Sequence, residues 1–489
     1  MKNSKFKIQN FLSVIGILAM LCGANFAQET PPTPGAPKTV AIPAVKENKL
    51  PNGLTVAVVE RKNVPLVTVQ LLVRSGARNE EMSQAGLANL TVSLLTKGTK
   101  TRSATQIAEQ MEFLGGSINT GAGWSNSVVT VNVMSDKLDQ AMTILSDVVM
   151  NPAFKQEEID LLKSQTLDNL NYNLQQPGFL ANYVASKYSF GEHPAGGTPK
   201  SISAITRDDI VNFRQNSYTA DNAVLIFAGD ITAVKANALA RKFFGTWKKS
   251  AGKTSGIGNG NGMTNETNNR TRRILVVDLP DSGQAAVKYL KDVNVGRVSS
   301  GNTSGVYYPA IVLNSLLGGG YSSRLNQEIR IKRGLSYGAG SGFSWRNDES
   351  NFATSTQTKN ESAAEVVKLV LDEIDKLAEN SIAATELNPR KLVLTGDFGR
   401  DLETTQGLAG ALADLYSFGL PAGELNAYMK SVQAISDTQI RTFAKQNLLG
   451  GDVIVVGDYA KFKDDLKTRF PNMTVEVVKA AELDLNTIR

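Results

Sequence analysis

Histidine and cysteine are almost missing from this sequence of 489 residues, which holds one of each, His193 and Cys22. Cysteine is needed both for a thiol nucleophile and for a disulfide framework. Because Cys22 lies within a leader that we expect to be removed, the mature chain should have neither. The same scarcity leaves Asp and Glu as the main source of good metal ligands, since one histidine cannot form a site by itself.

Long apolar runs and dense basic runs are also missing. Beyond residues 1–27 no segment has 18 uninterrupted apolar residues, so we expect no stable membrane insertion. The formal net charge is +6, and half of it comes from Lys2, Lys5 and Lys7 in the leader. No cluster of Lys and Arg with interleaved aromatic residues follows, so we infer no nucleic-acid partner.

Residues 1–27 have the organisation of a cleaved secretory signal. Lysines precede an apolar run over residues 11–21, which is too short to span a membrane. Small residues follow and suit cleavage after Ala24 or Ala27. Leu21, before the cysteine, stands where a lipoprotein signal requires a small residue, which argues against lipidation. We therefore predict a protein that is exported to the periplasm or otherwise out of the cytoplasm.

Short strings that recur about 230 residues apart predict an internal duplication. Three pairs of segments share the spacing: 188–191 with 416–419, 204–210 with 434–440, and 228–230 with 456–458. Residues 28–46 hold five prolines, and residues 251–272 are rich in Gly and Asn, so both are expected to be linkers. We predict an α+β fold of two homologous αβ domains, 47–250 and 273–489, with antiparallel sheets and helices packed on one side.

Residues 86–99, GLANLTVSLLTKGT, predict a buried helix around which the first domain is organised. Its leucines fall at i, i+3, i+7 and i+8 and form one apolar stripe, and a glycine ends the pattern. A second face carries Asn89, Val92 and Ser93, at i, i+3 and i+4. On their own, these three residues are ordinary positions on a helix surface.

The same stretch resembles the zinc-binding helix of the M16 (pitrilysin/insulinase-like) peptidases, whose pattern is roughly G-L-A-H-x-x-E-H-x-L-x-K-G-T. The resemblance covers residues 47 to 470. It places the two zinc histidines at Asn89 and Ser93, the catalytic glutamate at Val92, and a third zinc ligand near Asn169. Asn and Ser are poor zinc ligands and Val takes up no proton. The resemblance therefore implies a degenerate zinc motif and no metal bound by this chain.

Two neighbouring residues do not restore the site. Asp168 is the only acid in residues 165–176, and one carboxylate cannot hold zinc without the histidines. His193 lies in the string FGEHP over residues 190–194, far from the motif helix, and we interpret it as structural.

A second motif survives in the other half, where residues 317–337 read LGGGYSSRLNQEIRIKRGLSY. It resembles the C-terminal M16 signature, in which an arginine and a tyrosine seven residues later reach toward the substrate. Arg330 and Tyr337 have that spacing. A tyrosine hydroxyl that donates to an oxyanion is worth about 3–4 kcal/mol of barrier, and an arginine fork can hold substrate carbonyls or carboxylates. The alternative is structural: Arg330 pairs with an acid and Tyr337 fills the core.

The triple glycine Gly318, Gly319 and Gly320 allows two interpretations. A phosphate-binding turn is one, but no Lys-Ser/Thr follows at the spacing of a nucleotide-binding loop. We predict instead a close-approach turn that lies along the path of a bound peptide.

An emptied zinc motif beside a retained Arg/Tyr pair resembles one subunit type of the bacterial M16B peptidases. The resemblance implies half of a clamshell-shaped M16/LuxS-like metallohydrolase that has no peptidase activity alone. It would complete, in trans, the site of a partner subunit that carries zinc on His-x-x-Glu-His and degrades or processes peptides. Two alternatives stay open: a non-enzymatic scaffold, like the M16-related core subunits of respiratory complexes, and a lone peptidase with a metal site rebuilt from carboxylates.

Overall fold

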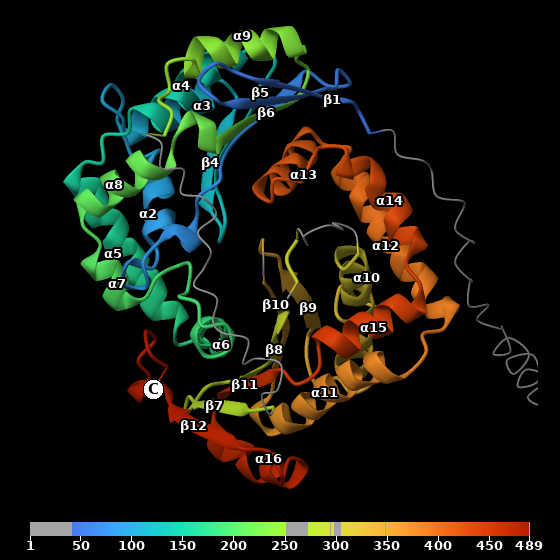
Figure 1. The fold of residues 1–489 in the computed structure, drawn as a ribbon. Helices are drawn as coiled ribbons and strands as arrows, with labels where there is room; N and C mark the ends of the chain where they lie inside the picture. Colours follow the sequence, from blue (N-terminus) through green and yellow to red (C-terminus); the bar gives the residue numbers. More distant parts are fainter. Residues whose placement is uncertain (1–41, 251–271, 294, 298–304, 348, 489) are drawn as a thin grey trace, which may run out of the picture. The chain divides into compact units, whose positions relative to one another are not determined.

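The computed structural model describes residues 42–250, 272–293, 295–297, 305–347 and 349–488 (Figure 1). The predicted signal at residues 1–27, most of the proline-rich segment and nearly all of the Gly/Asn-rich segment lie outside these ranges. Within the described ranges, no helix combines the length and apolarity that a membrane crossing requires. We call residues 42–250 the first half and residues 272–488 the second half.

The first half forms a six-stranded sheet in the order β1-β2-β6-β3-β5-β4. Its strands are β1 Val45–Lys49, β2 Thr55–Glu60, β3 Leu66–Val73, β4 Ser117–Ala122, β5 Ser127–Met134 and β6 Ala223–Gly229. Strand β1 starts inside the segment that the prolines predicted as a linker, and Val45 packs against the apolar residues of the sheet.

The second half repeats this arrangement in the order β12-β7-β11-β8-β10-β9. Its strands are β7 Ile274–Asp278, β8 Ala285–Val293, β9 Ala339–Ser344, β10 Ser350–Thr358, β11 Asp452–Gly457 and β12 Val475–Lys479. Across the second sheet, the five strands β7-β11-β8-β10-β9 have the same order and relative directions as β2-β6-β3-β5-β4 in the first sheet. The α+β fold of two homologous units is therefore confirmed.

Both sheets are mixed, whereas the sequence led us to expect antiparallel ones. Strand β6 lies between β2 and β3, parallel to the first and antiparallel to the second, and β11 lies between β7 and β8 in the same way. Because the outer two strands of each trio point in opposite directions, a strand inserted between them must run parallel to one.

Helices pack around both sheets (Figure 1). Those of the first half are α2 Leu87–Leu94, α3 Ala104–Phe113, α4 Leu138–Met150, α5 Gln156–Asn173, α6 Pro177–Tyr188, α7 Pro199–Ala204, α8 Arg207–Ser217 and α9 Ala233–Phe244. Those of the second half are α10 Tyr307–Leu317, α11 Ala363–Glu379, α12 Ala384–Asp401, α13 Thr405–Ser417, α14 Glu424–Ala434, α15 Asp437–Asn447 and α16 Lys463–Arg469.

Each half contributes one helix that packs on the sheet of the other half. Helix α13 of the second half packs on β3 and β6, where Leu408 and Leu412 join a buried cluster with Ile226. Helix α6 of the first half packs on β8 and β11, where Val184 joins a cluster with Ile454. Each sheet is therefore covered on both faces, and the second cover comes from the other half.

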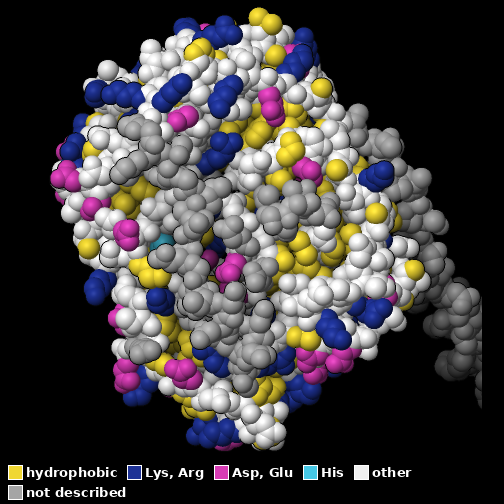
Figure 2. Space-filling view, viewed as in Figure 1, with side chains coloured by type: hydrophobic (Ala, Val, Ile, Leu, Met, Phe, Trp, Pro, Cys, Tyr) yellow, Lys and Arg dark blue, Asp and Glu magenta, His cyan; other side chains and the backbone are white. Residues whose placement is uncertain are grey.

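Charge is mixed on the face of the molecule that Figure 2 shows. Lys and Arg side chains are interspersed there with Asp and Glu, and apolar patches lie between them. The described residues of this face form no continuous basic surface of the kind that a nucleic-acid backbone requires.

Candidate functional site

The motif helix predicted from residues 86–99 is α2, which starts after Gly86 and ends at Leu94. Gly86 has φ of 94°, in the left-handed region that favours glycine. The predicted leucine stripe is buried, with exposed fractions of 3% or less. The helix ends earlier than the sequence pattern predicts, because the N–H of Leu95 turns to the carbonyl of Val92 in a tighter turn.

The positions that correspond to a zinc site hold no suitable donors. Asn89 is exposed, Ser93 is partly buried, and Val92 is fully buried against the core. Asn169 is exposed on α5, the helix that packs beside α2. Across the described residues, no group of three or more His, Cys, Asp and Glu could hold a metal ion. The side chains at these four positions therefore do not fit a catalytic zinc ion.

Glu80 holds the N-terminus of α2, and sequence analysis missed it. Its buried carboxylate accepts hydrogen bonds from the backbone N–H groups of Gly86, at 2.6 Å, and Ala88, at 2.9 Å. A carboxylate there satisfies donors that a glycine cap leaves open and interacts favourably with the helix dipole. Glu80 precedes Gly86 by six residues, outside the spacing of known capping motifs, so the sequence carried no usable signal.

His193 lies against this cap. Its Nε2 is 3.5 Å from Oε2 of Glu80, and the residue is 8% exposed. The imidazole ring packs against Trp124, with ring centroids 5.2 Å apart, and the guanidinium of Arg346 lies over the same indole. Arg346 pairs with Glu192 at 2.9 Å. The single histidine therefore contacts the support of α2 and belongs to no set of metal ligands in the described residues.

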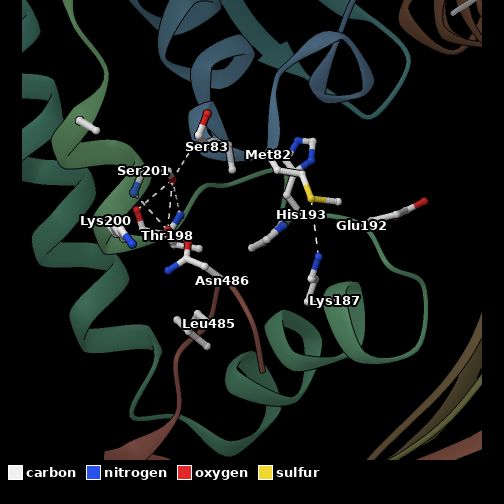
Figure 3. Close-up of a pocket in the computed structure, with 13 residues that line it drawn as sticks. Met82, Ser83, Lys187, Glu192, His193, Thr198, Lys200, Ser201, Leu485 and Asn486 are labelled. Carbon is white, nitrogen blue, oxygen red and sulfur yellow. Dashed lines mark hydrogen bonds between the residues drawn. The ribbon is translucent and has the colours of Figure 1, made fainter. Parts of the chain in front are cut away.

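A recess beside this cap is shown in Figure 3. Thr198, Ser201 and Asn486 point toward one another there: the Thr198 hydroxyl donates to Oδ1 of Asn486 at 2.9 Å, and the Ser201 hydroxyl donates to the carbonyl of Ala85 at 2.8 Å. On the other side, the Lys187 ammonium lies 3.6 Å from the Met82 sulfur. These contacts tie the segment before α2 and the C-terminal segment to the start of α7.

In the Arg/Tyr motif of the second half, Tyr337 is exposed and Arg330 is half-buried. Arg330 lies in η5, a π-helical turn over Asn326–Ile331, and Tyr337 precedes β9 and is 91% exposed. The Arg330 guanidinium lies 5.0 Å from the ring centroid of Tyr321 and makes no ion pair within the described residues. The alternative of a paired Arg330 and a core Tyr337 does not match this geometry. Sequence analysis did not single out Tyr321.

Arg324, from the same motif, contrasts with Arg330. Its guanidinium makes a bidentate ion pair with Glu386 of α12, at 2.7 and 2.8 Å. This pairing lowers the pKa of the Glu386 carboxyl. Arg324 therefore joins the motif to α12, whereas Arg330 makes no ion pair with any residue that the structure describes.

The triple glycine allows a close approach within the chain. A Cβ on Gly318 would lie 2.3 Å from the backbone nitrogen of Ser341, and one on Gly319 would lie 2.7 Å from Cα of Ser315. The N–H of Ser341 donates to the carbonyl of Gly318 at 3.2 Å, so the end of α10 meets β9. The close-approach turn is present at two of the three glycines, and a role for Gly320 or for the turn in peptide binding stays a prediction.

Tyr337 borders an open recess of about 280 Å³. The recess is lined by Gln284, Ser336, Tyr337, Gly338, Ser355, Thr356 and Gln357. Its walls are polar hydroxyl and amide groups, which suit contacts with a peptide backbone.

Two family models match the chain. Residues 55–188 match the model described as insulinase (peptidase family M16), and residues 204–392 match the model described as peptidase M16 inactive domain. Among curated proteins, an uncharacterized zinc protease of Rickettsia felis is 30% identical over 346 residues, which cover 68% of this chain and 79% of that protein. An uncharacterized zinc protease of Bacillus subtilis is 24% identical over 365 residues, which cover 74% of this chain and 85% of that protein.

Two solved structures have the same fold. One is a peptidase M16 inactive domain from Pseudomonas fluorescens, with a TM-score of 0.74 and 25% identity, covering 84% of this chain and 98% of that one. The other is a protease from Helicobacter pylori, with a TM-score of 0.77 and 21% identity, and the match covers 85% of this chain and 100% of that one.

Proposed function

This chain belongs to peptidase family M16, and from that premise we propose that it is the non-zinc-binding subunit of a heteromeric M16B zinc peptidase. The partner subunit carries His-x-x-Glu-His, and this chain supplies Arg330 and Tyr337 to the partner's active site. One contrast supports the proposal. Helix α2 offers no zinc ligands, whereas Tyr337 is exposed and Arg330 is paired with no acid of the described residues.

Arg330 and Tyr337 suit two tasks in peptide hydrolysis. Zinc in the partner would activate the attacking water. Negative charge develops on the oxygen of the scissile carbonyl, and the Tyr337 hydroxyl can donate a hydrogen bond to it. The Arg330 guanidinium can hold a substrate carbonyl or carboxylate with its forked donors. Tyr321 beneath the guanidinium would restrict its movement.

The site of action in this proposal is the periplasm, and the substrates are short or unfolded peptides. Support for export comes from the basic start, the short apolar run and the small residues of positions 1–27. Support for peptides comes from the polar, open recess beside Tyr337.

Reconstitution tests the proposal. The mature chain is purified alone and together with a His-x-x-Glu-His subunit encoded in the same genome, and peptide hydrolysis is measured. We expect no hydrolysis by this chain alone and hydrolysis by the pair that exceeds that of the partner alone. Zinc-dependent hydrolysis by the isolated chain would contradict the proposal, and a pair that assembles without any gain in hydrolysis would indicate a scaffold.

The Tyr337→Phe variant tests whether the Tyr337 hydroxyl acts as an oxyanion donor. Removal of one oxyanion donor is expected to lower kcat of the pair by about 10²- to 10³-fold, while assembly measured by size-exclusion chromatography stays intact. The matched control is Tyr172→Phe, which removes the hydroxyl of another exposed tyrosine on α5. Equal activity of the two variants would remove Tyr337 from the active site.

A further inference from the structure

Lys288 is a buried lysine with no partner among the residues that the structure describes. It lies on β8 and is 5% exposed, and its ammonium makes no hydrogen bond or ion pair within the described residues. Lysine is almost never buried unless it is paired, because removing an ammonium from water costs several kcal/mol. Burial lowers the pKa of Lys288 to about 8, and no neighbouring charge contributes to that shift. Among the residues that the structure describes, none thus provides a counter-ion.

The side chain reaches an open recess. Side chains alternate along a strand, so Lys288 shares a face with Ala286 and Leu290, which pack in the cluster that α6 covers. Lys288 also lines a recess of about 360 Å³ together with residues of β9 and β10. The ammonium is therefore the one charged group among the residues that line this recess.

Glycines keep the recess open. Gly340 and Gly342 of β9 line it, and neither has a positive φ. A Cβ on Gly342 would meet no atom within 4 Å, and one on Gly340 would meet only a carbonyl oxygen at 3.4 Å. Neither backbone conformation nor internal packing requires glycine at these positions. Their effect is to leave space for another molecule above the strand.

The recess adjoins the one that Tyr337 borders. Ser355 of β10 lines both, so a chain that lies beside Tyr337 can continue past Ser355 to Lys288. The exposed hydroxyl of Ser344 lines the second recess and can donate to a backbone carbonyl, whereas the Ser341 hydroxyl donates to Oδ1 of Asn314 at 2.7 Å and keeps only acceptor capacity.

We propose that Lys288 binds a carboxylate of the peptide substrate, at a subsite a few residues from the bond that is cleaved beside Tyr337. The inference rests on the proposed function. Two sources supply such a group: the C-terminal carboxylate of a short peptide, and an acidic side chain within it. In either case the carboxylate provides a counter-ion, which none of the described residues supplies to the buried ammonium.

Peptide binding to Lys288→Met tests the inference, since methionine keeps the length of the side chain and removes the charge. Affinity is measured by fluorescence anisotropy for the mature chain, alone and paired with its partner subunit. Three probes are used: a labelled short apolar peptide with a free C-terminus, its C-terminal amide, and that amide with one internal glutamate. Charged hydrogen bonds of this kind are worth about tenfold or more in affinity.

The expected result is a loss of about tenfold or more for at least one carboxylate-bearing probe and no change for the neutral amide. Loss for the free C-terminus alone assigns the terminal carboxylate, and loss for the glutamate probe alone assigns an acidic side chain. Lys291→Met, three residues along β8, is the matched control and should leave all three affinities unchanged.

Equal affinities for Lys288→Met and the wild type overturn the inference, and so does an equal loss for neutral and acidic probes. Absence of peptide binding by the wild-type pair overturns it as well. The proposed function fails separately, if Tyr337→Phe and Tyr172→Phe pairs hydrolyse peptides equally. Lys288→Met should fold normally because it removes a buried charge, and a melting temperature at or above that of the wild type checks this.

Discussion

At the scale of single residues, the useful sequence signals were the chemical identities of the motif positions. Asn89 and Ser93 could be recognised as poor zinc ligands because flanking residues fixed their alignment, and the same kind of alignment is the basis for proposing Arg330 and Tyr337 as a functional pair. Glu80 could not be found in this way. Its partners are backbone N–H groups, which leave no trace in the sequence.

Glu80→Gln should destabilise the start of α2. The amide keeps one acceptor oxygen, so one of two backbone donors loses its partner and the helix terminus loses a charge. We expect the free energy of unfolding to fall by about 1–3 kcal/mol, measured by urea denaturation. The control is Glu81→Gln, at the exposed neighbouring position, which should have no measurable effect. Similar losses in both variants would contradict a capping role for Glu80.

Asp292 on β8 should make stability depend on pH. Burial, and then the nearby Glu192 and Glu349 carboxylates, raise its pKa from 3.8 to about 7. The folded chain then holds a proton that the unfolded chain releases, so the contribution of Asp292 to stability falls as the pH rises from about 4 to about 7. Asp292→Asn should gain stability over the wild type above pH 7 and lose this gain near pH 4.

Urea denaturation at several pH values measures that difference. Asp136→Asn, which alters an exposed carboxylate, is the control and should show no such pH-dependent gain. A constant difference between Asp292→Asn and the wild type across the range would show that Asp292 does not titrate as inferred.

At the scale of elements, α2 shows what a sequence pattern predicts and where it stops. Leucine spacing predicted the helix and its buried stripe, since the 3.6-residue period fixes which side chains share a face. It did not predict that Val92 on the second face would also be fully buried. Burial on that face depends on which elements pack there, and those elements come from distant parts of the sequence.

Val92→Glu should therefore be costly, although it restores the residue type of the zinc-peptidase motif. A carboxylate at a fully buried position without a partner lowers the free energy of unfolding by about 3–5 kcal/mol at pH 7. Thermal denaturation measures the loss, and Asn89→Asp on the exposed face of the same helix should change stability by less than about 0.5 kcal/mol. A stable Val92→Glu variant would show that α2 still tolerates a catalytic glutamate.

At the scale of the whole molecule, repeated strings predicted two homologous units, and the matching strand orders confirm them. The exchange of α6 and α13 was not predicted. All seven residues of β6 are buried, and such a continuous apolar run indicates a strand that is covered on both faces. The run could not reveal which helix provides the second cover, because that choice depends on tertiary packing.

Leu412→Ala tests whether the packing of α13 on the first sheet makes the stability of one half depend on the other. Leu412 is fully buried between α13 and the first sheet, so the truncation should lower the free energy of unfolding by about 2–5 kcal/mol. Amide exchange should accelerate in β6 of the other half as well as in α13. Leu392→Ala, at an exposed position on α12, should leave both unchanged. Faster exchange confined to the second half would indicate that the halves unfold independently.

One helix of each half packs on the sheet of the other half, so neither half alone contains all the helices that bury its own sheet. Cutting the polypeptide between them would yield two fragments, each with a bare apolar surface and a spare amphipathic segment shaped for its counterpart. Each fragment should aggregate or fold incompletely when it is expressed alone, and the two should fold together when they are mixed. This complementation needs no covalent bond between the halves, because each fragment supplies the helix that covers the sheet of the other.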